Sequence, residues 1–156
     1  MPHNFRIEDN DLGAGGPKAK YKANIEAIRL LQTLEKEERL ATPEEQEVLS
    51  HYVGWGGIPQ AFEENNGSWT NEYSELKNTL TSEEYSAARA STLNAFYTSP
   101  TVIHSMYEAL ENMGFTKGNI LEPSCGVGNF MGLIPESMSK AKMYGVELDP
   151  VSGRIA

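Results

Sequence analysis

A glycine-rich turn between two short apolar segments is the feature that most constrains the fold of this chain. Residues 118–123 have the composition of a short strand that ends in an acid and a proline, and residues 143–148 read as a second strand. Gly126 and Gly128 lie between them, followed by a short helical pattern to residue 134. Strand, helix and strand within about thirty residues are typical of a βαβ unit, whose right-handed crossover makes the strands parallel. The sequence therefore predicts an α/β fold.

Both predicted strands end in a glutamate, Glu122 and Glu147. Glycines in the turn allow the backbone to approach a ligand closely, and the helix that follows offers free N–H groups to a negative group. A carboxylate about twenty residues beyond such a turn can accept both hydroxyls of a ribose, and Glu147 lies 21 residues after Gly126. This arrangement predicts a site for an adenosine-containing cofactor.

Two residues distinguish between the candidate cofactors. A dinucleotide-binding turn has a third glycine where this chain has Met131. The carboxylate of Glu122 would repel a pyrophosphate, whereas it suits the ammonium group of S-adenosylmethionine. We therefore expect S-adenosylmethionine rather than NAD, and an oxidoreductase is disfavoured.

Helical periodicity dominates the chain before the turn. Apolar residues at helical spacing predict a helix from Lys18, with a stripe formed by Ile25, Ile28, Leu31 and Leu34. Thr42 and Thr81 each precede a glutamate by three residues, which predicts two capped helix starts. Helices are also predicted near residues 72–80 and 82–93, and from Pro100.

These patterns divide the chain into three parts. Residues 1–17 are glycine-rich near their end and are predicted to be a flexible arm. Residues 18–94 form an acidic helical region, and residues 95–156 contain the βαβ unit. Trp55 lies in a glycine-rich turn of the helical region, where it is either a core aromatic or part of a contact surface.

The charge balance argues against a DNA-binding groove in this chain. The 156 residues contain 13 Lys and Arg and 22 Asp and Glu, for a net charge of −9, so phosphates would be repelled.

No apolar run is long enough to span a membrane and no signal peptide is recognisable. The one cysteine, Cys125, excludes an internal disulfide, so we expect a cytoplasmic protein. No histidine has a second ligand at metal spacing, so no metal site is predicted.

Three motifs together resemble a known enzyme family. They are Phe96-Tyr97-Thr98-Ser99-Pro100, the run from Ile120 to Phe130, and Gly145-Val146-Glu147-Leu148-Asp149-Pro150. In this order they resemble the start of N6-adenine-specific DNA methyltransferases. The helical region, with Tyr52-Val53-Gly54-Trp55-Gly56-Gly57, further resembles the N-terminal region of the large methylase–helicase proteins of phages and integrative mobile elements.

The resemblance implies a Rossmann-like methyltransferase domain and assigns roles within it. Thr98 would contact the methionine carboxylate of S-adenosylmethionine, and Glu122 would lie near its amino group. Glu147 would hold the ribose, and Leu148 would pack against adenine. The complete set of predicted cofactor-binding residues is Tyr97, Thr98, Pro100, Glu122, Pro123, Ser124, Gly126, Gly128, Asn129, Phe130, Glu147 and Leu148.

The catalytic motif of that family, Asn/Asp/Ser-Pro-Pro-Tyr/Phe, is absent from this chain. We therefore expect an N-terminal fragment without catalytic residues, inactive alone, whose parent would methylate DNA at adenine through its remaining part and carry a helicase part in the same polypeptide. The alternative is a docking module of a larger DNA-processing protein.

Overall fold

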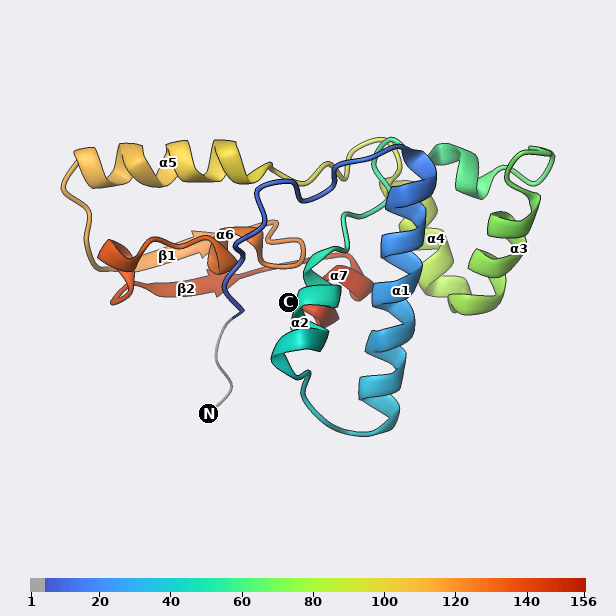
Figure 1. Ribbon diagram of the computed structural model, residues 1–156, viewed down its shortest axis with the longest axis horizontal. Coiled ribbons are helices and arrows are strands. Elements are labelled where there is room, and N and C mark those ends of the chain that lie inside the picture. Colours follow the sequence, from blue (N-terminus) through green and yellow to red (C-terminus); the bar gives the residue numbers. More distant parts are fainter. Residues whose placement is uncertain (1–4) are drawn as a thin grey trace.

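The computed structural model describes residues 5–156, so the first four residues of the predicted arm lie outside the described part of the chain. The protein is a mixed structure in which 51% of the chain is helical and two short strands form a parallel sheet. Figure 1 shows helices α1 to α4 at one end of an elongated molecule and helix α5 with the sheet at the other.

The first two helices begin where the sequence predicts them. Helix α1 (Pro17–Lys36) buries the apolar stripe against its neighbours. Helix α2 (Pro43–Ser50) begins with a complete capping box, in which the Thr42 hydroxyl accepts the Glu45 N–H and the Glu45 carboxylate accepts the Thr42 N–H. The capping box satisfies backbone donors that the first turn of a helix leaves free.

The rest of the helical region closes one apolar core. It contains the 3-10 helix η1 (Pro59–Phe62) and helices α3 (Thr70–Thr79) and α4 (Ser82–Ser91). Helix α4 has the second predicted capping box, between Thr81 and Glu84. The core is rich in aromatic rings, and several of them meet edge to face, as Trp55 does with Phe62 at 5.4 Å between centroids.

The βαβ unit follows helix α5 (Pro100–Asn112). It consists of strand β1 (Asn119–Glu122), helix α6 (Asn129–Gly132), the 3-10 helix η2 (Glu136–Met138) and strand β2 (Lys142–Gly145). The strands are parallel, which confirms the predicted orientation, and they pair Glu122 with Gly145. Hydrogen bonds continue the pairing beyond the strands, from the Val146 N–H to the Glu122 carbonyl and from the Cys125 N–H to the Val146 carbonyl.

Helix α7 (Pro150–Ile155) returns the chain to the helical region. Val151 is almost fully buried in the core formed by α1 to α4. Arg154 contacts the carboxylates of Glu35 on α1 and Glu84 on α4. The βαβ unit is thus attached to the helical region through its last helix as well as through the segment before α5.

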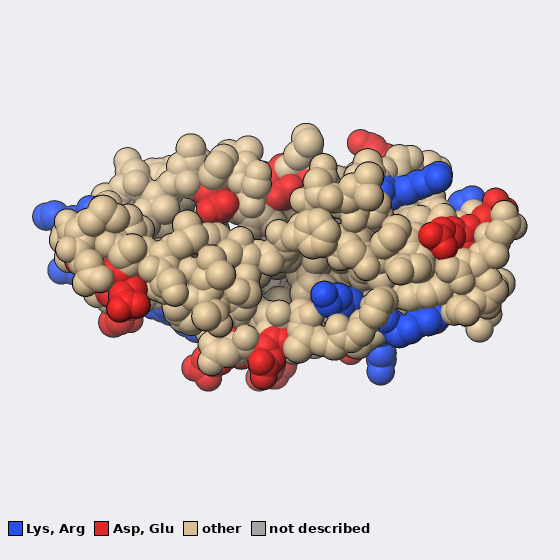
Figure 2. Space-filling view, turned by 90° about the horizontal axis from the view of Figure 1, so that it is seen from above, with Lys and Arg blue, Asp and Glu red and all other residues tan. Residues whose placement is uncertain are grey.

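The sheet has one open apolar face. Leu121 and Tyr144 are paired in the register, and both are exposed, as are Val146 and Leu148 further along the chain. Parallel sheets are usually covered on both faces. Helix α5 also exposes Val102, Met106 and Met113. Figure 2 shows the molecule from above, with acidic and basic side chains in small separate groups on this face. No helix among the described residues is both long enough and apolar enough to cross a membrane.

Candidate cofactor site

The glycine-rich turn adopts a conformation that requires glycine. Gly126 and Gly128 have φ angles of 56° and 88°, in the left-handed region, where a side chain other than glycine is strained. The Gly128 N–H donates to the Cys125 carbonyl at 2.9 Å, which closes the turn. Gly128 then precedes α6, so the turn leads directly into the helix as predicted.

Glu147 fastens this turn to the end of β2. Its Oε2 accepts the Gly126 N–H at 2.7 Å, and its Oε1 accepts the N–H groups of Leu148 and Asp149, both at 2.8 Å. A carboxylate offers about four acceptor positions, so one remains open on Oε2. In this arrangement the Glu147 carboxylate can accept a hydrogen bond from one further hydroxyl group, whereas the sequence predicts that it accepts from both hydroxyls of a ribose.

The two strand-end carboxylates converge on the turn. Burial raises the pKa of the Cys125 thiol, and the negative charges of Glu147 and Glu122 raise it further. Burial, with a contribution from Glu122, also raises the pKa of Tyr107 to about 12. The Cys125 thiol is therefore protonated at neutral pH and is not an activated nucleophile.

Tyr97 lies between the turn at Gly126 and the turn at Gly54. A Cβ atom at Gly126 would lie 3.1 Å from Cε1 of Tyr97, and one at Gly54 would lie 3.5 Å from its Cζ. The Tyr97 hydroxyl is 2.7 Å from the Ser152 Oγ, which in turn bonds the Asp149 Oδ1 at 2.7 Å. A carboxylate only accepts, so Ser152 donates to Asp149 and Tyr97 donates to Ser152. Tyr97 thereby joins the turn, α7 and the helical region.

The other predicted residues have different surroundings. Pro100 is buried as the first residue of α5, and Phe130 packs edge to face against Tyr107 at 6.2 Å. Asn129 begins α6, and its Oδ1 is buried without a hydrogen-bond partner among the described residues. The remaining four are exposed at the carboxyl ends of the strands or just before α5: Thr98, Pro123, Ser124 and Leu148.

Gly145 and Met131 are not among the predicted cofactor-binding residues, but they pack directly beneath the glycine-rich turn. A Cβ atom at Gly145 would lie 2.6 Å from Cε of Met131 and 2.8 Å from Sγ of Cys125. Gly145 is therefore the position at which the turn lies directly on β2. Met131 and Cys125 are 14 and 20 residues away from Gly145 in the chain, and the only local signal of the close approach is a glycine within the predicted strand, two residues before Glu147.

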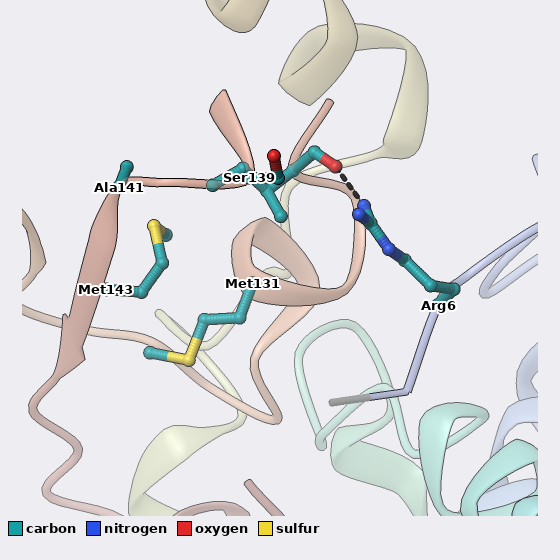
Figure 3. A pocket seen from close by; sticks show the side chains of 6 residues that line it. Arg6, Met131, Ser139, Ala141 and Met143 are labelled. Carbon is teal, nitrogen blue, oxygen red and sulfur yellow. Dashed lines mark hydrogen bonds between the residues drawn. The ribbon is translucent and has the colours of Figure 1, made fainter. Parts of the chain in front are cut away.

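Met131 also borders a separate hollow of about 330 Å³. Figure 3 shows Met131 and Met143 lying between α6 and β2, with Arg6 reaching in from the N-terminal segment and bonding the Ile134 carbonyl. None of the predicted cofactor-binding residues lines this hollow. It therefore lies apart from the candidate site.

Trp55 is a core residue. Its side chain is 1% exposed, so of the two interpretations of this turn the core aromatic is confirmed and the contact surface is wrong. The backbone beside it is also tightly packed, since a Cβ atom at Gly56 would lie 2.1 Å from the Ala95 carbonyl oxygen. The alternative interpretation of the chain as a docking module is therefore no longer supported by an exposed Trp55.

Comparison with known proteins finds one partial similarity. The chain matches no family model, and no solved structure matches it. It is 29% identical over 143 residues to the "Defense against restriction protein B" of Escherichia phage P1. The aligned region covers 92% of this chain but 5% of the phage protein.

These comparisons contradict the family assignment made from the motifs. The chain was predicted to resemble N6-adenine-specific DNA methyltransferases and methylase–helicase proteins, and no methyltransferase family or fold is found. The short sequence motifs around Tyr97, Gly126 and Glu147 also have a structural role in this fold, because their hydrogen bonds hold the glycine-rich turn and cap the start of α7. The family assignment is therefore withdrawn, together with the N6-adenine specificity that it alone supplied.

Proposed function

We propose that the carboxyl ends of β1 and β2 bind S-adenosylmethionine, and that the chain is the cofactor-binding part of a larger methyltransferase with a Rossmann-like sheet. The observation that carries the proposal is the turn at Gly126, which two left-handed glycines shape and the Glu147 carboxylate fastens to β2. Ligands of open parallel sheets bind beyond the carboxyl ends of the strands, where Glu122 and Glu147 lie.

The residues present fit the chemical groups of this cofactor. The open acceptor position on Glu147 suits one ribose hydroxyl, and the unpartnered Asn129 Oδ1 is a second buried acceptor next to the turn. The carboxylate of Glu122 suits the ammonium of the methionine group. The exposed Leu148 offers an apolar surface for adenine.

S-adenosylmethionine supplies an electrophilic methyl group on a sulfonium when it is bound. This chain binds and orients it: Glu122 balances the positive charge, the glycines allow close approach of the backbone, and Glu147 fixes the ribose. Tyr97 holds the turn in place through its ring and its hydroxyl.

A dinucleotide fits the same turn less well. The Met131 side chain occupies the position of the third glycine and lies over Gly145, where close helix–strand packing would otherwise need a small residue. The two strand-end carboxylates would repel a pyrophosphate.

DNA is the methyl acceptor that we propose for the larger protein. The phage P1 protein is named for defence against restriction, and methylation of a restriction site is a chemical means of protecting DNA from cleavage. The acidic composition of this chain places the groove for the DNA duplex elsewhere in such a protein.

The test is calorimetric titration of the chain with S-adenosylmethionine, S-adenosylhomocysteine and NAD. We expect the two adenosyl amino acids to bind and NAD not to bind, and we expect S-adenosylmethionine to slow the alkylation of Cys125. Glu147→Gln should weaken binding about 10-fold, since a charged acceptor becomes a neutral one. Glu108→Gln, at an exposed position of α5, is the matched control.

Two results would contradict the proposal. Tighter binding of NAD than of S-adenosylmethionine would overturn the cofactor. No binding of S-adenosylmethionine at millimolar concentration, by a chain whose circular dichroism shows it folded, would show that the site is not formed by these residues.

A further inference from the structure

A second hollow lies in the helical region, away from the glycine-rich turn. It has a volume of about 830 Å³ and opens between α3, α4 and the loop that follows η1. That volume is within the range of small-molecule sites. Ten residues line it, and the ones that matter for its chemistry are Glu64, Asn65, Tyr73, Lys77, Tyr85 and Arg89.

Two cations in this hollow form no salt bridge with a carboxylate within residues 5–156. Arg6, Arg29, Arg39 and Arg154 each form an ion pair with a glutamate. Arg89 and Lys77 form none, although the chain has a large excess of acidic residues. Tyr73 and, more weakly, the charge of Glu64 raise the pKa of Lys77, which keeps it positively charged. Two cations without a salt bridge, on neighbouring helices in one hollow, are suited to an anionic group such as a phosphate.

Aromatic rings form the wall next to these cations. The Lys77 Nζ lies 5.3 Å from the ring centroid of Tyr73 and 5.7 Å from that of Tyr85. Phe62 supports the Tyr85 ring from behind, with 5.4 Å between centroids. Aromatic rings beside cations are the combination that binds the base and the phosphate of a nucleotide.

The loop after η1 brings acceptors to the same hollow. The Glu63 carboxylate is held by the Asn66 side-chain amide at 2.8 Å, so this acid supports the loop. Glu64 and Asn65 are exposed and line the hollow. Their oxygens can accept from an exocyclic amino group, which adenine, cytosine and guanine have and uracil and thymine lack.

We propose that this hollow binds a nucleotide whose base carries an exocyclic amino group. Lys77 and Arg89 hold the phosphate, Tyr73 and Tyr85 contact the base, and Glu64 with Asn65 accepts from its amino group. The nucleotide is either a free mononucleotide or one unit of a single strand. This site is separate from the proposed S-adenosylmethionine site and does not depend on it.

The test is an NMR titration of the whole chain with AMP, UMP, inorganic phosphate and a short single-stranded oligoadenylate. We expect AMP to shift the ring signals of Tyr73 and Tyr85 and to bind about 10-fold more tightly than UMP or phosphate. Tighter binding of the oligoadenylate than of AMP assigns the site to single strands, and equal binding per nucleotide assigns it to free nucleotides. Both results support the proposal.

Variants identify the cations that are responsible. Lys77→Gln and Arg89→Gln should each weaken AMP binding about 10-fold, because each removes a charge-assisted hydrogen bond. Lys117→Gln makes the same charge change at an exposed position between α5 and β1, and it should leave binding unchanged. Thermal unfolding of each variant verifies that it is folded.

Four results would overturn the proposal. They are equal binding of phosphate and AMP, equal binding of UMP and AMP, equal weakening by Lys117→Gln, and AMP-induced shifts at Gly126 and Gly128 without shifts at Tyr73 and Tyr85. The last result would place AMP at the glycine-rich turn instead.

Discussion

The Tyr97 hydroxyl permits a sharp test of how the glycine-rich turn is held. Tyr97→Phe removes the hydroxyl that donates to Ser152 and keeps the ring that lies against Gly54 and Gly126. The change therefore separates the hydrogen bond from the packing. Ser152 keeps its own bond to Asp149, so no donor is left unsatisfied.

The expected loss in the free energy of unfolding is about 1 kcal/mol, the net value of a neutral hydrogen bond. Removing the ring as well, in Tyr97→Ala, should cost about 3 kcal/mol, at the low end for an aromatic side chain because Tyr97 is only partly buried. The ring, rather than the hydroxyl, should thus provide most of the stabilisation.

Urea unfolding followed by circular dichroism measures both values. Tyr97→Phe should lower the midpoint without changing the slope of the transition. Tyr144→Phe is the matched control, since Tyr144 is 50% exposed on the open face of the sheet, and its effect should stay within about 0.5 kcal/mol. Equal losses for Tyr97→Phe and Tyr97→Ala would refute the division between ring and hydroxyl.

Three further predictions concern the turn and α7. Gly145→Ala should destabilise the protein by about 1–3 kcal/mol, because the new Cβ would overlap Met131 and Cys125; a melting temperature equal to that of the parent chain would count against this close approach. Because the raised pKa keeps the Cys125 thiol protonated, its alkylation should be slower at pH 8 than in the urea-unfolded chain, with the difference shrinking as the pH rises; equal rates at pH 8 would contradict the shift. Arg154→Gln should cost about 1–2 kcal/mol by leaving Glu84 unpaired, and adding Glu84→Gln should cost less than the sum of the two single changes in denaturant titrations; strict additivity would show that the pair is not coupled.

Much of the local structure could be predicted because its signals are local. Thr42 and Thr81 each lie three residues from the glutamate that completes the capping box, so the interaction is contained in one turn of chain. The parallel orientation of β1 and β2 follows from the handedness of a short crossover, whereas the register that pairs Glu122 with Gly145 comes from the structure. The strands themselves end earlier than expected, since β2 stops at Gly145 and residues 146–148 form the loop that Glu147 caps.

The rest depends on contacts between distant segments. The sequence shows Asp149 and Pro150 as a helix start, but it does not show that Val151 completes a core whose other buried residues lie between 63 and 130 positions earlier in the chain, from Tyr21 to Ala88. The position of Tyr97 between Gly54 and Gly126 likewise results from packing across three segments. The family assignment was wrong for a related reason, since glycine turns and acidic strand ends also arise where a fold needs a tight turn and a helix cap.

The attachment of α7 to the helical region has a consequence for the order of folding during synthesis. Arg154 contacts Glu35 across 119 positions of the chain and Glu84 across 70. At the usual rate of translation, roughly 6 to 24 s separate the synthesis of Glu35 from that of Arg154. For that interval the apolar stripe of α1 lacks Val151 as a neighbour. We therefore expect the nascent helical region to remain loosely packed and open to chaperones until residues 150–155 leave the ribosome.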